Sequence, residues 1–173
     1  MSRLFWVDLE MSGLEIETNV IIEAAAVITD FDLNELESYH AVVKQDQKYI
    51  DQMDDWNRKT HGASGLIAKI PNGLSPERVE EDLTELARKH FGQEKVILAG
   101  NSVNHDRMFL NTYFKKFSKH LHYRTLDVTS WKLVMKNKFN IEFQKRNSHR
   151  AVDDIRESIS ELKHYLKYVK PTI

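Results

Sequence analysis

Short apolar runs near the start of the chain predict β-strands. Residues 4–9 form one compact run, and residues 20–29 form a second that is rich in isoleucine, valine and alanine. Turn-forming residues at 30–35 separate the second run from a third candidate strand at 36–44, as in a hairpin. We therefore expect three antiparallel strands in this part of the chain.

Apolar positions take on a helical spacing further along. Ser75 and Pro76 suit an N-cap and a first helical position, and they precede a helical series of Val79, Leu83, Leu86 and His90. Residues 96–99 predict a strand that ends at Gly100. The helix expected after it would bury one side, made of Phe109, Leu110, Tyr113, Phe114 and Phe117.

The end of the chain repeats this alternation. Residues 123–128 predict a strand and residues 129–138 a helix, whereas the loop at 138–147 has no assigned role. The last helix has the clearest stripe, formed by Val152, Ile155, Ile159, Leu162, Leu166 and Val169. Strands first, then alternating helices and strands, predict an α/β fold with a central mixed sheet, antiparallel N-terminal strands and flanking helices. No internal repeat or domain boundary is visible, so residues 1–173 are expected to form one domain.

Composition narrows the function classes. The chain has no cysteine, which excludes disulfides, thiolate zinc sites and a cysteine nucleophile. Its net charge of -1 lacks the basic excess typical of proteins that grip long nucleic acids, so a short nucleic acid would fit better. Because neither a signal peptide pattern nor a membrane-spanning apolar run is present, we expect a cytoplasmic protein without a membrane partner.

Two carboxylates near the start of the chain are candidate metal ligands. Asp8 and Glu10 lie two residues apart in a predicted strand, so their side chains share one face. Carboxylates crowded together on an otherwise apolar strand repel each other unless cations hold them. The alternative is that both lie at an exposed strand end.

Further acidic residues sit at two predicted helix starts. Asp106 follows the strand that ends at Gly100, and Asp153 and Asp154 open the last helix, with His149 five residues before Asp154. The helix dipole alone favours acids at these positions, and Asp153 fits that simple role. Asp106, Asp154 and His149 could instead complete a metal site with a histidine base, which is the chemistry of phosphodiester hydrolysis.

These segments resemble the three motifs of the DEDD exonuclease superfamily, which has an RNase H-like fold. The spacing of His149, Ala151 and Asp154 matches its DEDDh subtype, and nearly the whole chain resembles the oligoribonuclease family. The strings that carry the resemblance are residues 6–14 (WVDLEMSGL), 53–57 (MDDWN), 60–66 (THGASGL), 99–102 (AGNS), 122–124 (HYR) and 153–158 (DDIRES). One departure is His105, where the wider superfamily often has an aromatic residue.

The resemblance implies a 3′-5′ exoribonuclease that hydrolyses very short single-stranded RNA, dinucleotides above all, to nucleoside 5′-monophosphates. It implies two divalent metal ions, Mg²⁺ or Mn²⁺, and the histidine would be the general base. The implied metal ligands are Asp8, Glu10, Asp106 and Asp154, and the implied base is His149.

The resemblance also implies substrate contacts and a homodimer. Leu14 and Trp56 would wedge against the bases, and His61 would lie near the 3′ end. The remaining implied contacts are a cap on the 5′ phosphate, made of Ser102, Arg124 and Thr129, and a residue that reaches the neighbouring subunit, Tyr123. Stacking on Trp56 would not depend on base identity, although a core position for this tryptophan is the alternative.

Two competing functions stay open at this point. A DNA exonuclease of the same superfamily, such as a proofreading subunit, would share the acidic motifs, although the strings around Trp56 and Tyr123 favour oligoribonuclease. A module that binds short RNA or a nucleotide signal without cutting it would not need His149 beside Asp154.

Overall fold

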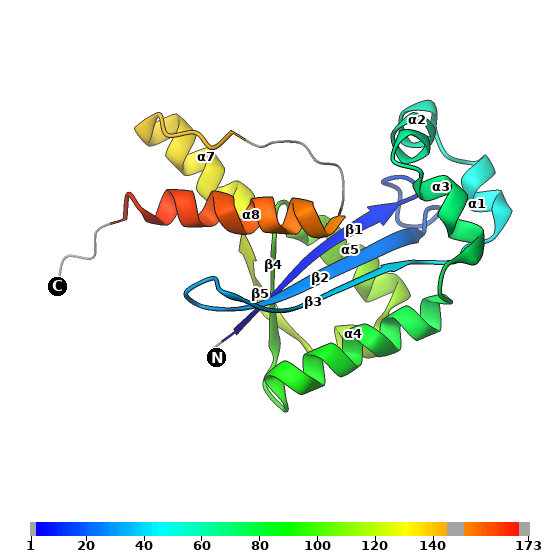
Figure 1. Cartoon of the computed structure of the whole chain (residues 1–173), viewed down its shortest axis with the longest axis horizontal. Helices are drawn as coiled ribbons and strands as arrows, with labels where there is room; N and C mark the ends of the chain where they lie inside the picture. The colour runs from blue at the N-terminus through cyan, green and yellow to red at the C-terminus, as the bar shows by residue number, and fades with distance from the viewer. Residues whose placement is uncertain (1–2, 145–150, 170–173) are drawn as a thin grey trace.

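The fold is built around a five-stranded mixed sheet. A computed structural model describes residues 3–144 and 151–169 (Figure 1). The strands lie in the spatial order β3-β2-β1-β4-β5; the first three pair antiparallel, β4 pairs parallel with β1, and β5 pairs parallel with β4. Their bounds are β1 Arg3–Met11, β2 Ile21–Asp30, β3 Glu35–Val42, β4 Val96–Gly100 and β5 Leu121–Asp127. This confirms the predicted α/β architecture and its antiparallel N-terminal strands.

Helices cover both faces of this sheet (Figure 1). Alternation along β1 directs Phe5, Val7 and Leu9 to one face and Leu4 and Trp6 to the other. The first face packs on α4 Pro76–Phe91, α5 Val103–Tyr113 and α6 Lys115–Ser118; the second packs on α7 Val128–Phe139 and α8 Ala151–Leu166. Each helix therefore contributes its apolar stripe to one of two cores.

A cluster of short helices follows β3, and the sequence patterns did not predict it. Their bounds are α1 Gln47–Asp51, α2 Asp55–Ala63, α3 Leu66–Lys69 and the 3-10 helix η1 Ile70–Asn72. Ile50, Met53, Leu66 and Ile70 bury their side chains with Val20 and Ile22 in a third, smaller core. Because most of these helices are only one turn long, they have no apolar period that could be recognised in the sequence.

Two predicted helices end earlier than expected. The helix after β4 breaks at Phe114, which has φ -116° and ψ 62°, so Phe114 and Phe117 are buried from either side of a kink rather than along one helix. The last helix ends at Leu166, and both Leu166 and Val169 are exposed, so neither belongs to its buried stripe. Helix α7, predicted over residues 129–138, extends one residue further at each end, from Val128 to Phe139.

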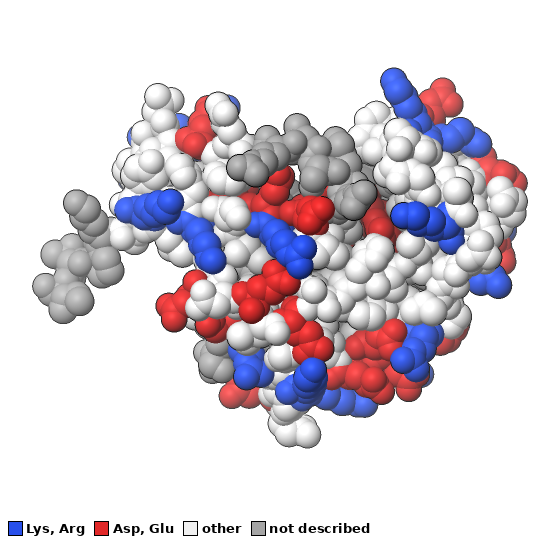
Figure 2. Space-filling view, in the orientation of Figure 1, with Lys and Arg blue, Asp and Glu red and all other residues white. Residues whose placement is uncertain are grey.

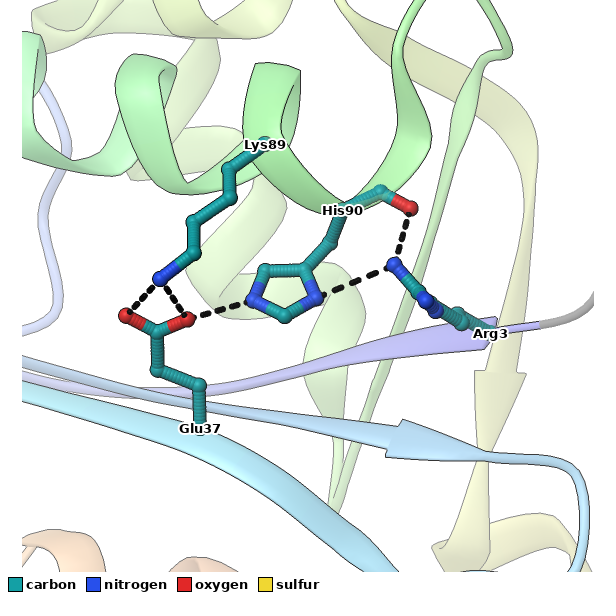
Figure 3. A network of polar contacts seen from close by, with 4 residues as sticks. All are labelled: Arg3, Glu37, Lys89 and His90. Carbon is teal, nitrogen blue, oxygen red and sulfur yellow. Dashed lines mark hydrogen bonds and ion pairs between the residues drawn. The ribbon is translucent and has the colours of Figure 1, made fainter.

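A polar network fastens the end of α4 to the sheet (Figure 3). The Arg3 guanidinium donates to the His90 carbonyl oxygen at 2.8 Å and contacts its Nδ1 at 3.1 Å. His90 Nε2 lies 2.5 Å from one carboxylate oxygen of Glu37, and the other carboxylate oxygen accepts from the Lys89 ammonium at 2.9 Å. Strands β1 and β3 are thereby joined to α4 at the start of β1.

Gly100 allows the two central strands to approach closely. A Cβ atom at this position would lie 2.9 Å from the carbonyl oxygen of Val7, which is too near for the backbone to remain in place. The residues that follow Gly100 are therefore held close against β1. No helix among the described residues is both long and apolar enough to cross a membrane.

Candidate active site

An acidic cluster lies where β1 meets the first turn of α8. Asp8 and Glu10 continue the face of β1 that carries Leu4 and Trp6, and this is the face that α8 covers. Asp8, Glu10 and Asp154 each offer a ligand atom, and these atoms all lie within 4.8 Å of one another. The structure thus brings together three of the four predicted metal ligands at a spacing suited to a shared cation.

Burial, together with nearby negative charge, raises the pKa of Glu10. Burial is the largest cause, followed by the charges of Glu23 and Asp154, and together they raise this pKa from 4.5 to about 7. Glu23 contributes because it lies directly opposite Glu10 in the β1–β2 register. A divalent cation would offset this repulsion, so the donor set fits a metal site made of hard oxygen ligands.

Asp106 reaches the same strand from the opposite helix layer. It belongs to α5, is 7% exposed, and one carboxylate oxygen accepts the Leu9 N–H at 3.0 Å. The pairing of β1 with β4 stops at Trp6 and Ala99, so Asp106 takes the place of a strand neighbour further along β1. Burial raises its pKa to about 7. Asp106 lies outside the three-residue cluster but next to it, because the Glu10 charge is among the causes of its raised pKa.

The two other predicted residues of this region have different outcomes. Asp153 is about half exposed, and its carboxylate lies 3.5 Å from the Arg156 guanidinium one turn along α8. This agrees with the simple helix-start role expected for it. The predicted base, His149, lies outside the described residues, so its assignment stays a prediction from the sequence.

The two residues predicted to wedge against the bases, Leu14 and Trp56, are exposed and lie near the end of β1. Leu14 is 71% exposed and Trp56 is 70% exposed, which excludes a core position for the tryptophan. Helix α2 carries Trp56 and starts at Asp54, whose side chain accepts the Asn57 N–H. On the same helix, His61 is buried, and its Nε2–H donates to the Met11 carbonyl oxygen at 3.1 Å.

That contact gives His61 a positioning role in this structure. Burial lowers the pKa of its imidazole, which favours the neutral form. A neutral imidazole with its proton on Nε2 matches a carbonyl acceptor. His61 therefore fixes α2, and with it Trp56, to the strand that carries Asp8 and Glu10.

Two residues of the predicted phosphate cap lie in contact. The Ser102 N–H donates to the Thr129 hydroxyl at 2.9 Å and to an Asp127 carboxylate oxygen at 3.0 Å, and the two hydroxyl oxygens are 3.2 Å apart. The same Asp127 oxygen caps α7 by accepting the Thr129 N–H at 2.9 Å. Ser102 has a left-handed φ of 51°, a strained conformation for a residue other than glycine that these contacts hold in place.

Arg124 and Tyr123 form a separate pair on β5. The Arg124 guanidinium carbon lies 5.0 Å from the centre of the Tyr123 ring, and the Tyr123 side chain is 73% exposed. Tyr123 also stacks on His122, with ring centres 4.5 Å apart. Within the described chain, no hydrogen bond joins Arg124 to Ser102 or Thr129, so only two of the three predicted cap residues are brought together.

Sequence reasoning missed three residues that the structure places at the site. Asp127 could have been found as an N-cap, because it directly precedes the first helical residue. Glu23 required knowledge of the strand register, which brings it opposite Glu10. Asn101 required the tertiary fold, because its partners Ser158 and Glu161 lie about sixty residues away.

A polar hollow of about 380 Å³ opens near the acidic cluster. Its wall combines β-strand, α2–α3 and α8 residues, namely Glu23, His40, Ser64, Leu66, Lys69, Ala151, Val152 and Asp153. On the face shown in Figure 2, the described lysines and arginines are interspersed with acidic residues and do not form one basic surface. The charge on this face therefore suits a small substrate better than a long polyanion.

Comparison with known proteins places this site within a family. The model of the exonuclease family matches residues 5–162. The human mitochondrial oligoribonuclease is 42% identical over 169 residues, which are 94% of this chain and 71% of the relative. The oligoribonuclease of Idiomarina loihiensis is 42% identical over 172 residues, which are 96% of this chain and 93% of the relative.

Solved structures of larger exonucleases share the fold. A structure of exonuclease I superposes with a TM-score of 0.75 at 14% identity, over 99% of this chain and 42% of that chain. Exonuclease I from Methylocaldum szegediense gives a TM-score of 0.72 at 15% identity, again over 99% of this chain and 42% of that chain. This chain thus spans about two fifths of the exonuclease I chains, and the likeness confirms the RNase H-like fold.

Fold, site and family model together define a nuclease: the chain belongs to the exonuclease family. Within that family it belongs with the oligoribonucleases, as its relatives at 42% identity show.

Proposed function

We propose that this protein is a 3′-5′ exoribonuclease that hydrolyses very short RNA, dinucleotides above all, to nucleoside 5′-monophosphates. The observation that carries the proposal is the cluster of Asp8, Glu10 and Asp154 at metal-ligand spacing, in a chain related to oligoribonucleases over nearly its whole length. The exposed wedge residue Trp56 supports a substrate that is bound by stacking and without regard to sequence.

The acidic residues would hold two divalent metal ions, Mg²⁺ or Mn²⁺. Asp8, Glu10 and Asp154 offer carboxylate oxygens to a common point, and Asp106 approaches from α5. When bound, such ions lower the pKa of a water and stabilise the leaving oxygen of the phosphodiester. Asp106 would keep its orientation through the Leu9 N–H, which leaves its other oxygen free of that bond.

His149 would remove the proton from the attacking water. This proposal rests on the sequence alone, through the five-residue spacing from Asp154. A general base of this kind contributes about 10²–10⁴-fold to the rate. His149→Ala should therefore lose activity by that factor, and an unchanged rate would remove His149 from the role.

The cap and the acidic cluster together would measure substrate length. The metal-holding carboxylates would receive the scissile phosphate near the 3′ end, whereas Ser102 and Thr129, with Arg124, would close on the 5′ phosphate. Arginine can form two hydrogen bonds to such a phosphate. A dinucleotide would fill the space between them, and a longer strand would have to displace the cap.

The active form would be a homodimer. Tyr123 is 73% exposed, and its described ring contacts are only with its neighbours His122 and Arg124. Several apolar side chains of α5 and α7 are exposed as well, namely Met108, Leu133, Val134 and Phe139. An isologous interface would cover such a surface on both copies at once. We further propose that residues 1–173 act as one exonuclease domain and that the protein works in the cytoplasm.

A time course on two RNAs tests the proposal. A 5′-phosphorylated diribonucleotide and a heptamer of the same sequence are incubated with Mn²⁺ or with EDTA, beside the matching DNA oligonucleotides. We expect rapid, metal-dependent loss of the dinucleotide. Loss of the heptamer while the dinucleotide persists would contradict the proposal, faster loss of DNA would favour a DNA exonuclease, and binding without cleavage would favour a binding module.

A further inference from the structure

Asn101 connects two helices that carry predicted site residues. It follows β4, and its side-chain amide donates to the Ser158 hydroxyl at 2.7 Å and to a Glu161 carboxylate oxygen at 3.3 Å, both on α8. The side-chain Oδ1 of the same amide accepts from the Thr129 hydroxyl of α7 at 3.4 Å. One amide therefore contacts the helix that bears Asp154 and the helix that bears a cap residue.

The α8 side of this connection is buried and rigid. Glu161 is 0% exposed and Ser158 is also buried. The Tyr165 hydroxyl donates to the second Glu161 oxygen at 2.9 Å, and the Ser158 hydroxyl donates to the Asp154 carbonyl oxygen at 2.9 Å. A buried carboxylate is costly unless hydrogen-bonded, so these partners hold Glu161 and hence the Asn101 amide in one orientation.

The other side of the connection is the cap pair. The Thr129 hydroxyl that donates to Asn101 also accepts the N–H of Ser102, the next residue in the chain. Asn101 therefore fixes Ser102 through the backbone and Thr129 through its side chain. No contact in the described residues gives Asn101 a place among the metal ligands themselves.

We propose that Asn101 is a positioning residue that sets the distance between the 5′-phosphate cap and the metal-binding carboxylates, and thereby the preference for dinucleotides. This inference rests on the proposed function, because it explains how that site would select length. The chain from Asp154 through Ser158 and Asn101 to Thr129 consists of three part-buried hydrogen bonds of 2.9, 2.7 and 3.4 Å. Such a chain transmits position without touching the substrate.

The consequence is a selective effect on substrate length. A dinucleotide would need the cap and the carboxylates at the correct separation, and a misplacement of about 1 Å can cost about 100-fold in rate. A heptamer would have to displace the cap, so its turnover would not depend on that separation. A general loosening of the fold would instead lower turnover of both RNAs by the same factor.

The test compares kcat/KM for the 5′-phosphorylated dinucleotide and the heptamer in the wild-type protein and in Asn101→Ala. We expect the ratio of the two values to fall by about 10- to 100-fold in the variant, mainly through the dinucleotide, while Mn²⁺ binding without RNA stays unchanged. An equal fall for both RNAs, or an unchanged ratio, would overturn the positioning role. A wild-type protein without dinucleotide preference would instead contradict the proposed function, and this inference with it.

A double variant that exchanges donor and acceptor between residues 101 and 161 tests whether the hydrogen bond itself, rather than the presence of the Asn101 side chain, sets the length preference. Asn101→Asp alone would set two carboxylates against each other, whereas Asn101→Asp with Glu161→Gln restores a donor and an acceptor with the same net charge. The Ser158 hydroxyl has one proton, which it donates to the Asp154 carbonyl oxygen, so in the double variant that proton would turn to the carboxylate at position 101 and only the contact with residue 161 would be restored in full. We expect the double variant to recover part of the dinucleotide preference that Asn101→Asp loses, and no recovery would overturn the proposal.

A matched asparagine provides the control for folding. Asn34 donates its amide to Asp30 at 3.0 Å in the β2–β3 turn, far from the carboxylate cluster in the sheet. Asn34→Ala should leave the length ratio unchanged. Melting temperatures of all variants would show that the folded protein is being compared.

Discussion

At the scale of single residues, the crowded carboxylates predict how metal-free protein responds to pH. The pKa of Glu10 rises from 4.5 to about 7 on folding, so the folded state binds its proton more tightly than the unfolded chain does. The contribution of Glu10 to the free energy of unfolding of metal-free protein should therefore be largest below about pH 4.5, and it should be lost as the pH rises through 7. A rise in pKa from 4.5 to about 7 corresponds to roughly 3 kcal/mol, so Glu10→Gln should remove a loss of about that size.

The measurement is thermal unfolding in EDTA at pH 5 and pH 8. The difference in melting temperature, wild type minus Glu10→Gln, should be larger at pH 5 than at pH 8. Added Mn²⁺ should raise the melting temperature of the wild-type protein more than that of the variant. Asp106→Asn should show a change in the same direction, because burial raises that pKa to about 7 as well. An identical pH profile in Glu10→Gln and wild type would contradict the carboxylate repulsion.

The exposed Trp56 also allows a prediction at the level of a single residue. Trp56→Ala should raise KM for the dinucleotide by roughly 5- to 150-fold, the equivalent of about 1–3 kcal/mol of stacking. Its melting temperature should stay the same, because the side chain is mostly exposed. Trp56→Phe keeps a flat ring and should recover part of the affinity. If Trp56→Ala unfolds the protein more readily without raising KM, the residue is structural.

At the scale of elements, the Arg3–His90–Glu37 network predicts a stability effect without a catalytic one. Arg3 lies five residues before Asp8, or about 16 Å along β1. Glu37→Gln weakens the contacts to Lys89 and His90. The free energy of unfolding should fall by about 1 kcal/mol, a decrease of about 2–4 °C in melting temperature.

The control is Glu85→Gln on the exposed side of α4, which should leave the melting temperature unchanged. Turnover of the dinucleotide should equal that of the wild-type protein in both variants. A loss of turnover in Glu37→Gln at a temperature where it is folded would show that the network reaches the active site.

Elements with a long apolar period were predictable from the sequence, and those held only by tertiary contacts were not. The alternation along β1 is enough to place Asp8 and Glu10 on one face, because strand geometry depends only on the local chain. The short helices between β3 and α4 and the kink at Phe114 depend instead on what packs around them. Likewise, Asn101 becomes a site residue only through Ser158 and Glu161, which no local pattern links to it.

At the scale of the whole molecule, the exposed Tyr123 predicts an active site shared between two chains. Tyr123 is exposed in the single chain, and its only described ring contacts are with its neighbours His122 and Arg124. If it completes the site of a partner copy, Tyr123→Ala should lower activity while the protein still runs at twice its 20.3 kDa chain mass. Light scattering after size exclusion measures that mass.

Mixing two impaired variants, Tyr123→Ala and Asp8→Asn, decides between a site shared by two chains and a site within one chain. Tyr123→Ala retains Asp8, and Asp8→Asn retains Tyr123, so a mixed dimer would hold one complete site if Tyr123 acts across the interface. Random exchange of chains should then restore about a quarter of the wild-type activity, because half of the dimers are mixed and each has one working site. If the mixture stays as inactive as its components while the chains exchange, Tyr123 acts within its own chain. A fully active monomer would remove the need for any partner.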